Sequence, residues 1–333
     1  MDLFRRLFSQ SGSKPQEKPV VSELAKNREA LSADTPIPMS RVLEPTPVAP
    51  SLADIIPPTA ADGATRPLPP ETIISSSNEH LTFGQSTDVG MVRSTNQDTV
   101  LSLFTTSRSD DQRPDFGLFI VADGMGGHHD GEKASALAGQ VVAANVIANV
   151  YLPMLKGEND ADRMPITEAM IAAVQKANAD IITKVPEGGT TLTAVAIIGD
   201  LAYVVHVGDS RIYIVTKDGL EQITRDHSLV QRLVELDQLT PEEALNHHQK
   251  NVLYRALGQS DNVEVDALTR RLPPKSKVML CSDGLWNLVS ETEITQIILG
   301  YSNPQEACDK LVALANTHGG TDNITTIVLH IPG

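Results

Sequence analysis

Apolar residues along the chain recur with two different spacings, and each spacing predicts a different element. Short runs rich in Val and Ile and bounded by turn residues are typical of buried β-strands, whereas apolar residues three and four positions apart are typical of helices. The first pattern predicts strands over residues 116–122, 192–198, 201–207, 211–216, 278–281 and 323–330. The second predicts helices over residues 132–151, 167–184, 229–237, 291–299 and 304–317.

The turns between successive strands indicate the fold class. Gly199-Asp200, which joins two predicted strands, and Lys217-Asp218-Gly219, which follows a third, are turn signals that break this region into antiparallel hairpins. Parallel strands would need crossover connections of roughly a dozen residues or more. We therefore expect an α/β (α+β) fold in which largely antiparallel sheets are covered by helices.

The first 78 residues differ in composition from the rest of the chain. Twelve of the 21 prolines lie between Pro15 and Pro70, and no aromatic residue lies among them. Such a segment cannot bury enough apolar surface to offset its ordering entropy. We expect a disordered, Pro-rich tail or linker over residues 1–78 and one folded domain over residues 79–333.

Charge and cysteine content narrow the function classes. Lys and Arg number 27 against 42 Asp and Glu, and the net charge of −15 makes nucleic acid an improbable partner. Cys281 and Cys308 are the only cysteines in the sequence, which excludes a disulfide scaffold and a thiolate zinc cluster. We expect a protein of the reducing cytoplasm.

The sequence predicts no integral membrane segment. The longest nearly apolar stretch, residues 136–152, is interrupted by Gln140, Asn145 and Asn149 and is shorter than the roughly 20 residues that a membrane span needs. We interpret it as a core helix. The first ten residues show no secretion signal and are either a frayed tail or one amphipathic turn that docks on a partner or a lipid surface.

Aspartates end three of the apolar runs: FGLFIVADG at Asp123, VVHVGDS at Asp209 and VMLCSDG at Asp283. Strand ends lie at the rim of a sheet, so these carboxylates can converge with Asp322 in GGTDN and Asp98 in RSTNQD. One Asp-Gly pair alone is usually a turn. Carboxylates clustered in this number would repel one another, which favours a site for hard cations such as Mg²⁺ or Mn²⁺.

Two such cations can share a water, lower its pKa and attract a phosphate, so that phosphate hydrolysis needs no protein nucleophile. Arg93 is a candidate phosphate clamp, although an Arg near an Asp is by default a surface salt bridge. Other chemistries find less support. The chain has no P-loop and no GxSxG elbow, and His129 replaces the third glycine of a dinucleotide motif. Adjacent histidines at 128–129 and 247–248 point in different directions and are weak candidates for a shared zinc.

Six segments taken together resemble one known family. RSTNQD, VADGMGGH, GGTTLTAV, VGDSR, CSDGLWN and GGTDNIT occur in this order between residues 93 and 325. They resemble the metal-dependent protein serine/threonine phosphatases of type 2C, and the bacterial branch is the most similar. The resemblance implies a four-layer α-β-β-α sandwich of two mainly antiparallel sheets flanked by helices. It also implies hydrolysis of phosphoserine and phosphothreonine on proteins by a water that bridges two Mn²⁺ or Mg²⁺ ions.

The resemblance further implies which residues bind the metals. Asp123 would bridge the two ions, and the backbone carbonyl of Gly124 would bind the second. Asp283 and Asp322 would complete the first, while Asp98 would act on the second mainly through water.

It also implies roles around the metals. Asp209 with Asp283 would form a weaker third metal site, and Arg93 would hold the phosphate, so that Arg93, Asp123 and Asp283 are the expected catalytic residues. Residues 226–258 resemble the family's flap region, which borders the site and gates substrate. They are equally well interpreted as a helical insertion that packs on the sheet.

Two departures from the family pattern leave part of the chemistry open. Gln97 stands where a glutamate is common, and Met125 stands where eukaryotic members place a histidine thought to protonate the leaving group. We therefore name no general acid. The expected partners are phosphorylated proteins, substrates of a serine/threonine kinase, and the oligomeric state stays open. The alternative function is a catalytically silent regulator that binds a phosphoprotein, which retention of the aspartates argues against.

Overall fold

The computed structural model describes residues 80–106, 114–126, 130–157, 163–245 and 247–333. These residues belong to the compact unit Leu68–Gly333, and the fold below is theirs alone. The tail predicted over residues 1–78 and the histidine pair at 128–129 lie outside the described residues.

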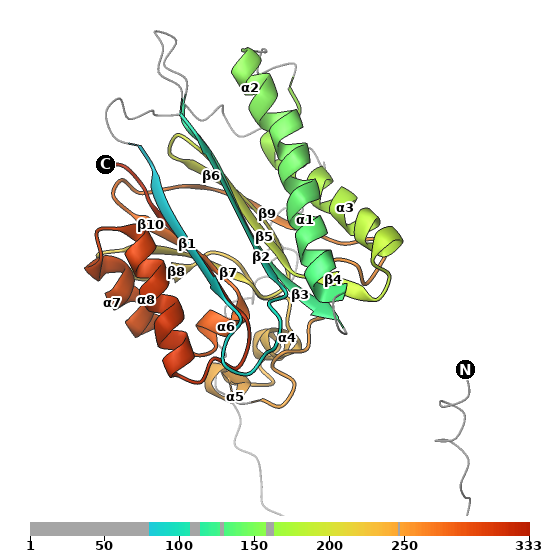
Figure 1. The fold of residues 1–333 in the computed structure, drawn as a ribbon, viewed down its shortest axis with the longest axis vertical. Helices are drawn as coiled ribbons and strands as arrows, with labels where there is room; N and C mark the ends of the chain where they lie inside the picture. Colours follow the sequence, from blue (N-terminus) through green and yellow to red (C-terminus); the bar gives the residue numbers. More distant parts are fainter. Residues whose placement is uncertain (1–79, 107–113, 127–129, 158–162, 246) are drawn as a thin grey trace, which may run out of the picture. The chain divides into compact units, whose positions relative to one another are not determined.

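Two antiparallel sheets form the centre of the fold (Figure 1). The five-stranded sheet has the order β1-β11-β10-β7-β8, with β1 at Thr82–Asp88, β7 at Arg211–Thr216, β8 at Gly219–Gln222, β10 at Lys277–Cys281 and β11 at Ile324–His330. The six-stranded sheet has the order β2-β3-β5-β6-β9, and β4 pairs with the end of β3. Its strands are β2 at Asp98–Thr105, β3 at Phe116–Gly126, β4 at Gly188–Thr190, β5 at Leu192–Ile198, β6 at Leu201–Val207 and β9 at Asp266–Arg271.

Helices cover the outer face of each sheet (Figure 1). The six-stranded sheet is covered by α1 at Asp130–Val146 and α3 at Ile166–Lys184, and α1 continues through the π-helical turn η2 at Ile147–Tyr151 into α2 at Leu152–Lys156. The five-stranded sheet is covered by α7 at Glu291–Gly300 and α8 at Pro304–Thr317. The short helices are α4 at Leu229–Glu235, α5 at Pro241–Leu245 and α6 at Asp283–Trp286.

Three apolar clusters lie between these four layers. On β3, Leu118 and Ile120 pack toward α1 and α3, whereas Phe119 and Val121 pack against the other sheet. Successive side chains of a strand point to opposite faces, so a strand buried on both faces needs an unbroken apolar run. The third cluster joins the five-stranded sheet to α7 and α8. The predicted four-layer sandwich is confirmed.

The strongest sequence patterns predicted their elements well. The strands β5, β6 and β7 and the helix α8 have the predicted bounds, and both predicted hairpins are present as the antiparallel pairs β5–β6 and β7–β8. The predicted helix over residues 132–151 corresponds to α1 and η2. By length and composition alone, the helical run Asp130–Lys156 could cross a membrane. Its residues Ala134, Ala138 and Val142 belong to the cluster beneath the six-stranded sheet, as expected of a core helix.

Candidate active site

The first two predicted aspartates meet across a strand pair. Asp98 begins β2 and lies directly opposite Asp123 of β3 in the antiparallel register. Just beyond Asp123, β3 leaves β5 and pairs with β4, where Gly124 lies opposite Thr190. The Thr191 hydroxyl accepts a hydrogen bond from the Asp123 backbone N–H at 2.9 Å. The carboxylates therefore lie at the end of the six-stranded sheet.

Two more aspartates come from the five-stranded sheet. Asp283 begins α6 immediately after β10, and Asp322 precedes β11. Ser282 joins the two sheets, because its hydroxyl donates to Asp98 Oδ2 at 2.8 Å and accepts from the Thr325 backbone N–H at 3.0 Å. The structure thus brings carboxylates of both sheets to one rim.

The carboxyl groups at this rim are electrostatically coupled. Burial raises the pKa of Asp98 to about 6, with a further rise from the charge of Asp322. Burial and the charges of Asp322 and Asp98 raise the pKa of Asp283 to about 7. Burial also raises the pKa of Asp123 well above its usual value, and the charges of Asp98, Asp283 and Asp209 add to the shift. Such repulsion is relieved by a proton or by a cation.

The donor set fits a hard cation. Oδ1 of Asp98 and Oδ1 of Asp283 are buried, and neither has a hydrogen-bond partner among the described residues. Oxygen-only donors of this kind suit Mg²⁺ or Mn²⁺. As the side chains stand, no three His, Cys, Asp or Glu residues of the described part surround one point closely enough to hold an ion. The fit therefore rests on the chemistry and the unpaired oxygens of the carboxylates, whose side chains must rotate to share an ion.

Arg93 lies beside this cluster. Its guanidinium Nη2 donates to Asp322 Oδ2 at 2.8 Å, and 53% of its side-chain surface remains exposed. The preceding loop is fixed as well, because the backbone N–H groups of Met91 and Val92 both donate to the Gly320 carbonyl, at 2.7 and 3.2 Å. Met91 and Val92 are the most exposed large apolar side chains of the described residues.

Asp209 and Gly124 lie in closely packed backbone at the same rim, Asp209 in a turn and Gly124 within β3. Asp209 is buried in the turn between β6 and β7, and its backbone carbonyl accepts from Trp286 Nε1 at 3.0 Å. Burial and the charge of Asp283 raise its pKa. A Cβ on Gly124 would lie only 2.2 Å from the Gly131 carbonyl oxygen, so only glycine fits there.

The two positions that depart from the family pattern also lie near the rim. The Gln97 backbone N–H donates to Asn323 Oδ1 at 2.8 Å, and the side-chain Nε2 lies 3.5 Å from the Gly126 carbonyl oxygen. Met125 contacts Gln259, whose Nε2 lies 3.5 Å from the Met125 sulfur.

Sequence reasoning missed the side chains that hold the loops together. Asn323 donates to the carbonyls of Val89 and Thr95, both at 2.9 Å, and so ties the loop that carries Arg93 to the start of β11. Asn323 and Ser282 both stand next to predicted aspartates, in GGTDNIT and CSDGLWN, and that adjacency was the available signal.

The comparisons with known proteins agree with this geometry. The family model described as Protein phosphatase 2C matches residues 93–316. The serine/threonine phosphatase stp of Listeria welshimeri is 35% identical over 243 residues, which cover 73% of this chain and 93% of that protein. The structure of the Streptococcus agalactiae serine/threonine phosphatase superposes with a TM-score of 0.65 at 33% identity, covering 76% of this chain and 100% of that one.

A third similar structure contains metal. It is the catalytic domain of the serine threonine protein phosphatase PstP in complex with two manganese ions, with a TM-score of 0.61 and 32% identity over 76% of this chain and 99% of that one. The sandwich and its acidic rim are thus those of a phosphoprotein-hydrolysing enzyme class. The chain belongs to the protein phosphatase 2C family, as the resemblance of its six segments implied.

Proposed function

We propose that this chain is a metal-dependent phosphatase that hydrolyses phosphoserine and phosphothreonine on proteins. The observation that carries the proposal is the meeting of Asp98 and Asp123 from one sheet with Asp283 and Asp322 from the other, beside the guanidinium of Arg93. The relatives named serine/threonine phosphatase support the substrate class. Neither the site nor the relatives favour a catalytically silent regulator.

The acidic rim would hold two Mn²⁺ or Mg²⁺ ions. Asp123 would bridge them, Asp283 and Asp322 would complete the first, and the Gly124 carbonyl with Asp98 would serve the second. The charge of Asp283 raises the pKa of Asp209, and these two residues would together form a weaker third metal site. Bound ions of this kind lower the pKa of a coordinated water and neutralise charge on a phosphate. The two manganese ions of the PstP structure support a site for two ions.

The residues around the metals would position the substrate. Arg93 would bind the phosphate oxygens through its planar guanidinium, which the contact with Asp322 holds at the rim. Met91 and Val92 directly precede Arg93 and expose their apolar side chains, so they would meet the protein part of the substrate. Residues 226–258 would border the site as a flap. No side chain is assigned as general acid, because Met125 offers no proton.

The substrates would be cytoplasmic proteins phosphorylated by a serine/threonine kinase. The buried thiols of Cys281 and Cys308, neither of which is in a disulfide, support a reducing compartment. The domain over residues 79–333 would carry the whole activity, because every assigned residue lies within it.

The test is metal-dependent phosphate release from a phosphothreonine peptide, measured with Mn²⁺, with Mg²⁺ and with EDTA. We expect turnover that requires a metal and falls at least about a hundredfold in Asp283→Ala. Asp309→Ala, which alters an exposed aspartate on α8, is the matched control and should keep full activity. A folded protein that releases no phosphate with either metal would refute the proposal.

A further inference from the structure

Two consecutive residues hold both sides of the turn that carries Asp209. Asp226 accepts hydrogen bonds from the Arg211 guanidinium, with the shortest at 2.7 Å. His227 bonds to Gly208 twice: its backbone N–H donates to the Gly208 carbonyl at 2.7 Å, and its ring Nδ1 accepts from the Gly208 N–H at 3.0 Å. The turn is therefore fixed on both sides of Asp209 by neighbouring residues.

The turn needs such support for two reasons. Gly208 has a φ of +112°, a backbone conformation that favours glycine. A Cβ there would lie 2.6 Å from the side chain of Thr191, so the surroundings leave no room for a larger residue. Asp209 is also buried close enough to Asp283 for the two carboxylates to repel each other. Without an anchor, repulsion would favour a turn that moves Asp209 away from the rim.

The ring of His227 is oriented by a second set of contacts. Because Nδ1 accepts from Gly208, the ring proton is on Nε2, which lies 3.1 Å from Asp266 Oδ2. Arg255 Nη1 donates to the other carboxylate oxygen of Asp266 at 2.7 Å. The side chain of His227 is 1% exposed and has no freedom to turn. The backbone donor of Gly208 thus assigns the ring proton to Nε2, which also lies 3.1 Å from Arg255 Nη1.

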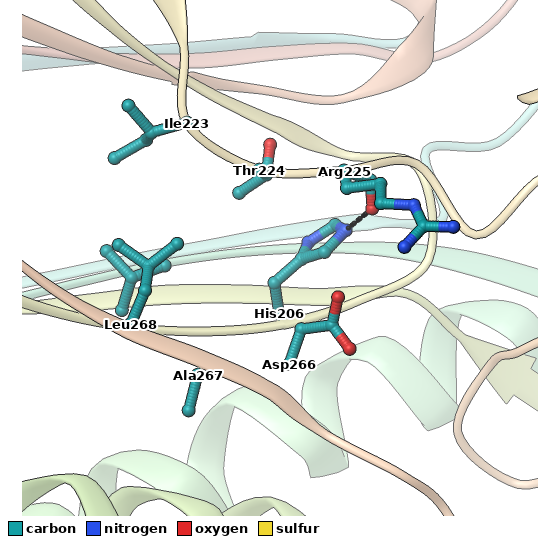
Figure 2. A pocket seen from close by; sticks show the side chains of 8 residues that line it. His206, Ile223, Thr224, Arg225, Asp266, Ala267 and Leu268 are labelled. Atoms are coloured by element: carbon teal, nitrogen blue, oxygen red, sulfur yellow. Dashed lines mark hydrogen bonds between the residues drawn. The ribbon is translucent and has the colours of Figure 1, made fainter. Parts of the chain in front are cut away.

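The contacts that lead to Gly208 begin at Asp266, which lines a pocket beside His206. Figure 2 shows Asp266 and His206 lining it, with His206 Nε2 bonded to the Arg225 backbone carbonyl at 3.0 Å. The rings of His206 and His227 lie 4.9 Å apart. Asp266 lies on β9, so the contacts run from the edge strand of the six-stranded sheet through His227 to Gly208.

We propose that His227 is a positioning residue that holds Asp209 in place for metal binding, through the backbone of Gly208 and without touching metal or substrate. The inference rests on the proposed function, in which Asp209 is a ligand of the weaker metal site. Loss of the Nδ1 acceptor should therefore weaken the binding of that ion while leaving the fold and the other ligands in place.

Two substitutions of His227 test whether the hydrogen-bond acceptor for Gly208, rather than the imidazole ring as a whole, is required. In His227→Asn the side-chain oxygen can occupy the position of Nδ1 and accept from Gly208. In His227→Gln the polar group lies near the position of Nε2 instead, and the bond to Gly208 is lost. His330→Asn is the matched control, because His330 is the last residue of β11, at the opposite end of that strand from Asp322.

The measurements are Mn²⁺ binding by calorimetry and turnover against Mn²⁺ concentration. We expect His227→Gln to weaken the last Mn²⁺ to bind by about tenfold or more, a typical cost of losing a residue that orients a ligand. His227→Asn should stay within about threefold of the wild type, a margin well below that typical cost. In an Asp209→Asn background the difference between Gln and Asn should vanish, since coupled residues are not additive.

Several outcomes would overturn the inference. Equal Mn²⁺ binding by the Gln and Asn variants would do so, as would an effect of His227→Gln that persists unchanged in the Asp209→Asn background. A lower thermal midpoint with unchanged Mn²⁺ binding would show that His227 is only structural. Calorimetry keeps these outcomes apart from a failure of the proposed function, because Mn²⁺ binding is measured whether or not phosphate is released.

Discussion

Asp98 and Asp123 face each other across the β2–β3 pair, one carboxylate from each strand in the same register. Backbone hydrogen bonding fixes this pairing, so the two residues stay opposite each other as long as the end of the sheet is formed. Ionising both carboxylates without a cation between them therefore costs stability. This cost links the metal site to the stability of the protein.

The first prediction concerns pH and the metal-free protein. The pKa of Asp98 is raised from 3.8 to about 6, so its favourable contribution to stability is fully present below about pH 4 and is lost as the pH rises through about 6. Asp98→Asn, which stays neutral, should gain stability relative to the wild type over this range. Each pKa unit is worth about 1.4 kcal/mol, which sets the gain at no more than about 3 kcal/mol.

Urea unfolding in EDTA from pH 4.5 to 7.5 measures this difference. The free energies of unfolding of variant and wild type should diverge as the pH rises. A difference that stays constant over the range would show that ionisation of Asp98 does not destabilise the folded protein.

The second prediction concerns the phosphate contact. Removing the guanidinium in Arg93→Ala should lower kcat/KM for a phosphopeptide by about 10- to 100-fold, the cost of one charge-assisted contact. Arg93→Lys should recover only part of it, because a lysine cannot form the planar bidentate contact. Arg270→Ala is the control: its side chain is also 53% exposed and paired with a carboxylate, Glu221, but it lies on β9. Similar losses in both arginine variants would contradict the assignment.

The third prediction concerns the close backbone contact at Gly124. In Gly124→Ala the new methyl group would meet the Gly131 carbonyl at 2.2 Å, and neither backbone can move without displacing the end of β3. We expect a loss of about 2 kcal/mol or more in the free energy of unfolding, together with weaker Mn²⁺ binding. Gly300→Ala, where a Cβ meets nothing within 4 Å, should change stability by less than about 1 kcal/mol. Urea unfolding and calorimetry of the two variants test the comparison.

The fourth prediction separates protein substrates from small ones. Met91→Ser and Val92→Ser should lower kcat/KM for a phosphopeptide with apolar flanking residues by several-fold, because each removes apolar contact area worth about 1 kcal/mol or more. The rate with p-nitrophenyl phosphate, which lacks flanking residues, serves as the reference for each variant. Leu299→Ser, which alters an exposed apolar residue on α7, is the control. Equal changes with both substrates would argue against a peptide contact at this loop.

The sequence predicted the elements whose burial pattern is simple. Strands β5, β6 and β7 are mainly apolar runs, and the two-residue turn between β5 and β6 left little choice of pairing for that hairpin. Strand β7 instead lies in the other sheet, where it pairs with β8 and β10. Strands β1, β4, β8 and β9 were missed. In β1 and β9 the segments TFGQSTD and DALTRR are mixed in polarity, as edge strands with partly exposed faces are. Propensity alone does not distinguish such segments from loops.

The sequence predicted the aspartates of the candidate site but not the hydrogen bonds that hold their loops together. The five aspartates were recognisable because each follows or precedes an apolar run. The hydrogen bonds that hold these aspartates and their loops in place were not recognisable, because they join distant segments. Ser282 bonds to Asp98 across 184 residues, and Asn323 bonds to Thr95 across 228. Local patterns carry no information on which loops meet at that separation.

The position of β11 determines when the enzyme can first exist. It is the last strand of the described fold, yet it lies between β1 and β10 in the middle of its sheet, with Asp322 at its start. A chain emerging from the ribosome can form the hairpins of the six-stranded sheet early, because those contacts are local. The other sheet and the placement of Asp322 must wait for this strand. We therefore expect a growing or truncated chain that lacks β11 to release no phosphate from phosphoproteins, and activity to start only when synthesis of the domain is complete.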